Sequence, residues 1–145
     1  MGLGMVRITD ADTAYRVFTA WRTCQYVYYL QQFIPHDNWD IRALVVGNHV
    51  LAAMRRRANG WKTNITYGAK AEPFKLSAEL EDLCLRIASI FDAAYLGVDL
   101  LADSNGFFYA IEANSAPGWK GLQEVTEFDI AAEISNYIVS CVRGK

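Results

Sequence analysis

Two β-hairpin signals constrain the fold more strongly than any other feature of this sequence. In the first, the turn pair Gly47-Asn48 separates two apolar segments, Ile41–Val46 and His49–Arg56. In the second, residues 103–106 form a turn between two further apolar segments within 96–114. Short apolar segments on both sides of a Gly/Asn turn are typical of antiparallel strand pairs. The chain is therefore expected to contain two hairpins, and each turn predicts which residues lie opposite each other.

Periodic spacing predicts helices around the hairpins. Asp10 can cap a helix over residues 11–23, Ser77 can cap a second, and the capping box Thr126-x-x-Asp129 starts a third. The third helix is expected to bury Ile130, Ile134, Tyr137, Ile138 and Cys141. The sequence also predicts two short strands, at 4–8 and 26–30. A subdomain boundary is expected near residue 35 and a long loop at 58–75.

The turn at Gly47-Asn48 also predicts the register of the first hairpin. A two-residue turn places Asp40 opposite Arg55 and Arg42 opposite Ala53. Side chains alternate along a strand, so one face carries these charges while Arg56 need not join them. The other face is apolar and is expected to form the core, through Ile41, Ala43, Val45, Val50, Ala52 and Met54.

The second hairpin brings carboxylates together. If Asn105-Gly106 makes the tight turn, Asp99 directly faces Glu112, and a four-residue loop would leave them as diagonal neighbours. Any even loop keeps Asp99, Glu112 and Asn114 on one face. Two carboxylates about 5 Å apart repel each other, so such a pair persists with a shared proton or a bound cation. Two carboxylates and an amide oxygen suit a hard ion such as Mg²⁺.

Two other interpretations of this hairpin are weaker. Asp99 and Glu112 would be ordinary solvated residues if this face of the sheet were exposed, but both lie in strands rich in apolar residues. Buried carboxylates without partners are too costly to be incidental. A calcium loop beginning at Asp103 is excluded because Phe107 and Phe108 follow it and no acidic terminator comes in place.

These segments resemble the ATP-grasp superfamily, in particular its RimK-like glutamate ligases. Residues 97–101 and 111–118 resemble the metal-binding strand pair and its following loop, and residues 30–34 resemble the hinge that contacts adenine. Residues 55–64 resemble the basic strand and loop of the RimK-like branch. The resemblance implies an α+β fold: an ATP-grasp C-terminal subdomain with a mainly antiparallel sheet and helices packed on one face, plus a partial small lid subdomain.

By position, the resemblance implies roles for individual residues. Mg²⁺, with Mn²⁺ as an alternative ion, would bind Asp99, Glu112 and Asn114. ATP would contact Gln32, Phe33, Asp40, Lys62, Thr63 and Asn64. Enzymes of this family join a carboxylate to an amine through an acyl phosphate, here with an amino acid such as glutamate as the amine. Phosphoryl transfer needs cations on the transferring group, for which Arg42 and Arg55 are the candidates.

The chain also departs from the family pattern. Only the tail of the family's phosphate-covering Gly-rich loop could lie at residues 1–4, and the lysine before that loop has no upstream counterpart. Residues 65–69 also lack the expected Arg-Gly-Gly. The chain is therefore expected to be the C-terminal fragment of a longer ligase and to be inactive without the N-terminal region. Residues 1–34 would be the remnant of the lid and residues 35–145 the C-terminal subdomain with half of the nucleotide and metal site.

Composition excludes other classes of protein. The 145 residues are 52% hydrophobic, and 14 Lys+Arg against 16 Asp+Glu give a net charge of −2, which indicates a folded chain that binds neither nucleic acid nor membranes. Three separated cysteines indicate reduced, buried thiols in a cytoplasmic protein. The alternative function is a non-catalytic nucleotide-binding or assembly module that forms a homo-oligomer through aromatic residues: Trp21, Tyr26, Tyr28 and Tyr29.

Overall fold

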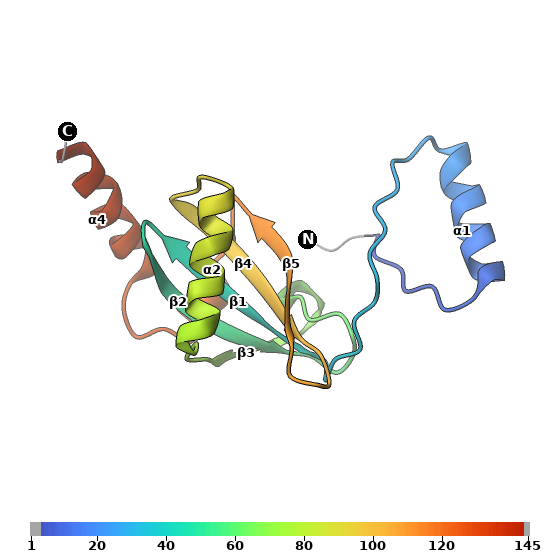
Figure 1. Ribbon diagram of the computed structural model, residues 1–145, viewed down its shortest axis with the longest axis horizontal. Coiled ribbons are helices and arrows are strands. Elements are labelled where there is room, and N and C mark those ends of the chain that lie inside the picture. Colours follow the sequence, from blue (N-terminus) through green and yellow to red (C-terminus); the bar gives the residue numbers. More distant parts are fainter. Residues whose placement is uncertain (1–3, 144–145) are drawn as a thin grey trace. The chain divides into compact units, whose positions relative to one another are not determined.

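The computed structural model describes residues 4–143 and divides into two compact units, Met1–Ile34 and Pro35–Lys145 (Figure 1). The first unit contains one helix, α1 (Ala11–Thr23), among its described residues. The helix begins where the sequence predicts, because the carboxylate of Asp10 accepts a hydrogen bond from the Thr13 backbone N–H at 2.8 Å.

The two short strands expected in the first unit are absent from its described residues. Residues 4–8 and 26–30 have an irregular backbone, although their side chains have strand propensity. A strand needs a partner for its backbone hydrogen bonds, and propensity without that partner does not form a sheet. The second segment instead turns one aromatic ring back onto α1: Tyr28 stacks on Trp21 with ring centroids 5.8 Å apart.

The second unit is built on a five-stranded antiparallel sheet in the order β3-β2-β1-β4-β5. The central strand β1 pairs with both β2 and β4, so the two predicted hairpins lie side by side. One edge strand falls within the segment expected to be a long loop. The strands are β1 (Trp39–Val46), β2 (His49–Arg57), β3 (Lys70–Pro73), β4 (Tyr95–Ala102) and β5 (Phe108–Asn114), with a 3₁₀ turn η1 (Ile65–Tyr67) before β3.

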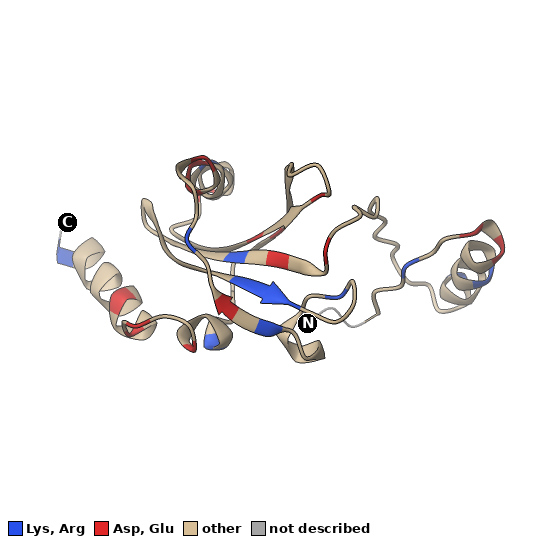
Figure 2. Ribbon diagram, turned by 90° about the horizontal axis from the view of Figure 1, so that it is seen from below, with Lys and Arg blue, Asp and Glu red and all other residues tan. Residues whose placement is uncertain are grey.

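Helices cover both faces of the sheet, which corrects the expectation of one covered face (Figure 2). On one face lies α2 (Ala78–Ile90), which begins at Ser77 as predicted, and its buried Leu80 and Cys84 pack on β1 and β4. On the other face, α3 (Lys120–Gln123) and the start of α4 (Ile130–Arg143) bury Leu122 and Ile130. The α+β class and the antiparallel sheet are confirmed.

The last helix begins later than predicted and buries less. Asp129 accepts a hydrogen bond from the Ala132 backbone N–H at 3.1 Å, whereas Thr126 donates to the Leu122 carbonyl and caps nothing. Ile134 and Tyr137 are half-buried against the sheet, but Ile138 is 56% exposed. The predicted apolar face is thus covered only over the first half of the helix.

Of the three cysteines, one is buried as expected. Cys84 lies on the buried face of α2, where burial raises the pKa of its thiol to about 11. Cys24 and Cys141 are exposed free thiols, which corrects the expectation that all three are buried. Within residues 4–143, no helix has the length and apolarity needed to span a bilayer.

A β-bulge makes the predicted register of the first hairpin wrong. Val45 lies opposite Val50 as the turn predicts, but Leu44 lies opposite Ala52, so Leu51 is an extra residue in β2. Beyond the bulge every pair is shifted by one residue. Asp40 therefore lies opposite Arg56 rather than Arg55.

The second hairpin contains a bulge too, and there the predicted pairing is confirmed. Ala102 lies opposite Phe108, so five residues form the loop, and the tight turn at Asn105-Gly106 is wrong. Ile111 is then an extra residue in β5, and this shift compensates for the longer loop. As a result, Asp99 lies directly opposite Glu112.

Candidate functional site

Four charged side chains converge on one face of β1, β2 and β4. Asp40 and Arg42 are two residues apart on β1 and so point to the same side of the sheet. Across β1–β2, Asp40 lies opposite Arg56, and across β1–β4, Arg42 lies opposite Asp99. The register of three neighbouring strands therefore assembles two carboxylates and two guanidinium groups in one place.

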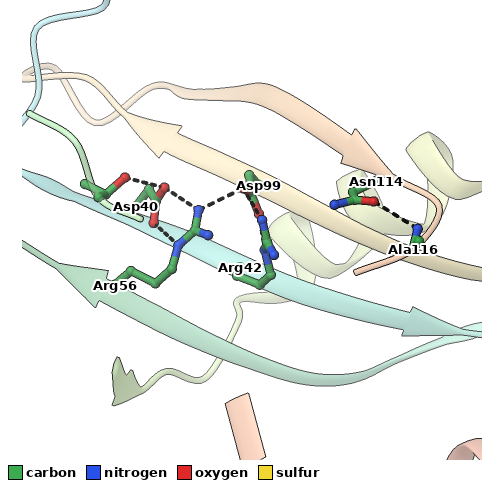
Figure 3. Close-up of polar contacts among 7 residues, drawn as sticks. Asp40, Arg42, Arg56, Asp99, Asn114 and Ala116 are labelled. Atoms are coloured by element: carbon green, nitrogen blue, oxygen red, sulfur yellow. Dashed lines mark hydrogen bonds and ion pairs between the residues drawn. The ribbon is translucent and has the colours of Figure 1, made fainter. Parts of the chain in front are cut away.

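These side chains form a continuous hydrogen-bonded network (Figure 3). Arg42 donates from Nε and Nη2 to the two oxygens of Asp99, at 2.5 and 2.6 Å. Arg56 donates in the same bidentate manner to Asp40, at 2.7 and 2.5 Å. The Nη2 of Arg56 also donates to Asp99 at 2.8 Å, and this bond joins the two pairs. We call these four residues the charged quartet.

The charged quartet is electrically balanced, and all of its members are buried except Arg42, which is half-buried. Asp40, Asp99 and Arg56 are 1%, 3% and 4% exposed. Buried charges are costly unless they are paired and hydrogen-bonded, and here two negative and two positive groups compensate each other. Burial works to lower the pKa of Arg56, but the hydrogen bonds and charges of Asp40 and Asp99 outweigh it and raise that pKa above its ordinary value. Arg56 is therefore a permanent cation.

The loop after β2 adds a fifth member to this region. Thr63 is buried and donates its hydroxyl to Asp40 at 2.6 Å. Beside it, the Lys62 ammonium lies 5.2 Å from the ring of Trp61 and 5.3 Å from that of Tyr67. These three side chains, with residues 58–60 and Gly68, line a pocket of about 300 Å³. The predicted nucleotide contacts Asp40 and Thr63 are thus joined directly, whereas Lys62 lies among aromatic rings.

The predicted metal ligands lie on β4 and β5, and one of them, Asp99, also belongs to the charged quartet. Asp99 and Glu112 are direct partners across β4–β5, and Asn114 pairs with Gly97, two residues further on the same face. Glu112 is exposed and Asn114 is half-buried. The Asn114 side-chain oxygen accepts a hydrogen bond from the Ala116 backbone N–H at 2.9 Å (Figure 3). The structure therefore brings all three side chains to one face of one hairpin.

The donor set fits a hydrated hard cation. A carboxylate has about four acceptor positions, and Asp99 uses three of them for Arg42 and Arg56. Asn114 likewise retains an acceptor position on its oxygen, and the Glu112 carboxylate faces solvent. Mg²⁺ keeps several waters and needs only a few protein oxygens. Residues 4–143 hold no cluster of three or more His, Cys, Asp and Glu side chains arranged for a metal, so the amide of Asn114 is needed to complete the set.

Arg55, one of the two predicted catalytic residues, lies away from the charged quartet. The bulge turns it to the opposite face of β2, where its guanidinium carbon lies 5.4 Å from the rings of Trp39 and Phe74. Its Nε lies 3.4 Å from a carboxylate oxygen of Glu72 on the edge strand β3. Arg42 is in the quartet as expected, but its neighbour there is Arg56.

Sequence reasoning missed Arg56 because the register could not be derived from the apolar pattern. Residues 50–54 are all apolar, so they show no alternation that would reveal which of them is extra. The one chemical signal in the sequence does not separate the two arginines. Asp40 lies in a strand that is otherwise apolar apart from Arg42, so it needs a buried cation, but the predicted register already places Arg55 opposite it.

Gln32 and Phe33, which the resemblance predicts to be hinge residues, belong to the first unit. The guanidinium carbon of Arg7 lies 3.8 Å above the centre of the Phe33 ring, so this aromatic face already stacks with a cation. Their role as adenine contacts stays a prediction, as does that of Asn64, which precedes the 3₁₀ turn η1.

The sequence matches known glutamate and amino-acid ligases. It is 34% identical over 138 residues to the tetrahydromethanopterin:alpha-L-glutamate ligase of Methanococcus maripaludis, covering 92% of this chain and 47% of that protein. It is 32% identical over 135 residues to the alpha-aminoadipate–LysW ligase LysX of Sulfurisphaera tokodaii, covering 90% and 47%. The chain thus spans about half the length of these curated relatives.

Solved structures and a family model agree with these matches. The ATP-grasp ligase PsnB, complexed with its minimal precursor, superposes with a TM-score of 0.61 at 21% identity, over 76% of this chain and 36% of PsnB. The macrocyclase MdnB of Microcystis aeruginosa gives 0.55 at 14% identity, over 90% and 45%. At such identities the likeness shows the fold alone. The model of the RimK-like ATP-grasp domain matches residues 1–138, so the chain belongs to the RimK-like ATP-grasp domain family.

Proposed function

We propose that this chain supplies the metal-binding part and half of the nucleotide site of an ATP- and Mg²⁺-dependent carboxylate–amine ligase. One observation carries the proposal: Asp99 lies opposite Glu112 on one side and opposite Arg42 on the other. A metal ligand and a phosphate-binding cation are therefore adjacent on one sheet face. Because the chain covers about half of its relatives, the complete reaction belongs to a protein with further residues.

The chemistry of each residue suggests its role in binding the metal or the phosphates. Bound Mg²⁺ would neutralise phosphate charge during phosphoryl transfer and would be held by Asp99, Glu112 and Asn114. Arg42 is held in one orientation by Asp99, and its remaining N–H donors are free to approach a phosphate oxygen. Lys62 offers a second cation beside the 300 Å³ pocket. Positioned cations of this kind stabilise charge without reorganising during the reaction.

The substrate assignment follows the names of the relatives. One is named a glutamate ligase that acts on tetrahydromethanopterin and another an alpha-aminoadipate–LysW ligase, so an amino acid is the common chemistry. We propose an amino acid such as glutamate as the amine and a carboxylate as the acceptor. Tyr67 and Gly68 line the pocket and belong to the segment 65–69, which lacks the Arg-Gly-Gly expected from the resemblance. We propose this segment as the place where acceptor preference would differ. Mn²⁺ as the ion and a cytoplasmic location belong to the same proposal.

The test is Mg²⁺-dependent ATP binding measured by calorimetry. Glu112→Gln keeps the size of the side chain but removes its charge, and we expect it to weaken Mg²⁺·ATP binding at least tenfold. Glu79→Gln on α2 is the matched control, because it removes the same charge from an exposed position on the opposite face of the sheet. Equal binding by wild-type protein and Glu112→Gln would refute the metal assignment.

A second candidate function is a non-catalytic assembly module. It is favoured by the exposure of aromatic residues in the first unit, where Tyr26 is 65% and Tyr29 80% exposed. Analytical ultracentrifugation discriminates between the two functions. A monomer that binds Mg²⁺·ATP supports the ligase, whereas an oligomer that binds neither metal nor nucleotide supports the assembly module.

A further inference from the structure

Arg56 occupies a special place among the basic residues near the site. It contacts a predicted nucleotide ligand and a predicted metal ligand at once, since Asp40 and Asp99 are both within 2.8 Å of its donors. Arg42 contacts Asp99 only. Arg55 contacts neither and lies on the other face of the sheet.

The shape of the Arg56 side chain explains how one residue serves two carboxylates. Its Nε and Nη2 form a fork that matches both oxygens of Asp40, while Nη2 carries a second hydrogen that reaches Asp99. The guanidinium plane is rigid, so the two carboxylates are fixed relative to each other. A lysine ammonium has no such fork, and it would bind one carboxylate well at the expense of the other.

We infer that Arg56 is a positioning residue that couples the nucleotide half of the site to its metal half. The inference rests on the proposed function, which assigns Asp99 to the metal, and on the predicted nucleotide contact at Asp40. A shift of Asp40 on nucleotide binding is transmitted through the Arg56 fork to Asp99. The site therefore responds as one unit, because Arg56 of β2 binds Asp40 of β1 and Asp99 of β4 together.

The test separates three arginines by what each one contacts. ADP is titrated into the full ¹⁵N-labelled chain, once with Mg²⁺ and once with EDTA, and binding is followed by NMR so that millimolar affinities are measurable. Arg56→Lys is expected to weaken ADP binding at least fivefold in both conditions. Arg42→Lys is expected to weaken binding more with Mg²⁺ than with EDTA, because Arg42 contacts Asp99 and not Asp40. Arg55→Lys is expected to change neither.

A stability control distinguishes positioning from a purely structural role. Ile130→Val removes one buried methyl group from the core on the same face of the sheet and lowers the melting temperature without touching the quartet. We expect Ile130→Val to retain wild-type ADP binding in both conditions at a temperature well below its transition. If Arg56→Lys lowers only the melting temperature, or weakens only Mg²⁺-dependent binding, the coupling role is refuted while the proposed function stands. If wild-type protein binds no ADP with Mg²⁺, both proposals fail.

Discussion

The two hairpins of the sheet differ in what their bulges do to the residues beyond them. Both carry one extra residue, Leu51 in β2 and Ile111 in β5. In β1–β2 the two-residue turn forms as the sequence predicts, and the bulge then shifts the partner of Asp40 from Arg55 to Arg56. In β4–β5 the loop is longer than predicted, and the bulge restores the predicted partner of Asp99.

The difference shows that a turn predicts the register of its hairpin only as far as the first bulge. The partner predicted for Asp40 was wrong although the turn at Gly47-Asn48 was correct. The partner predicted for Asp99 was confirmed although the tight turn at Asn105-Gly106 was wrong. A bulge inserts one residue and so exchanges the two faces of every residue after it on that strand. The pairing of charged residues beyond a bulge is decided by which register satisfies them, since an unpaired buried charge is costly.

The largest expected effect tests the shifted hairpin. Arg56→Met leaves two buried carboxylates short of a partner, and we expect a loss of about 3–5 kcal/mol in the free energy of unfolding. Arg55→Met, the neighbouring residue, removes contacts with Trp39 and Phe74 on a partly exposed face and should cost about 1 kcal/mol. Urea unfolding of both variants gives the comparison. Equal losses would mean that the bulge does not select between the two arginines.

A medium effect tests the hairpin whose pairing was predicted correctly. A Cβ atom at Gly97 would lie 2.6 Å from the Cβ of Pro117, in the loop that follows Asn114. Gly97→Ala must therefore displace this loop, and we expect a loss of about 1–3 kcal/mol in unfolding free energy together with weaker Mg²⁺·ADP binding. Gly60→Ala is the matched control for the unfolding free energy, because nothing lies within 4 Å of the added atom. A neutral Gly97→Ala would show that this loop moves freely.

The smallest expected effect is a difference between the two turns in how they respond to pH. Desolvation works to raise the pKa of Asp103, but hydrogen bonds from the backbone of Phe107 and Asn105 outweigh it and lower this pKa below its ordinary value. The stabilisation is therefore complete above the ordinary aspartate pKa and is lost as the pH falls through the lowered value. Amide NMR signals of the 103–107 loop should shift in that range and stop shifting in Asp103→Asn. The Gly47-Asn48 turn has no carboxylate and should not respond in the same way.

Elements with a local chemical signal were predictable from sequence. The helices α1 and α2 begin at their predicted caps, Asp10 and Ser77, because a cap is recognised from a few neighbouring residues. Segments 4–8 and 26–30 were not predictable, since strand formation depends on a distant partner. Asp129 rather than Thr126 caps α4 because Thr126 bonds back to the preceding helix, α3.

The composition of the site was more predictable than its geometry. The residue types and their order along β4–β5 are enough to indicate Asp99, Glu112 and Asn114, because one hairpin contains all three. The charged quartet needed the pairing of three strands, and the all-apolar run at 50–54 concealed the shift in β2. Arg56 could therefore be identified only from tertiary structure.

The three consecutive arginines at the end of β2 make the first hairpin tolerant of changes in its length. If Leu51 were deleted, the strand would pair without a bulge and Arg56 would still lie opposite Asp40. If instead a residue between the bulge and Arg55 were lost, Arg57 would move into the same position. In the first case Arg56 itself keeps the contact, and in the second the neighbouring arginine supplies the guanidinium group. The run therefore protects the site against the second kind of deletion, which would abolish a lone arginine's contact.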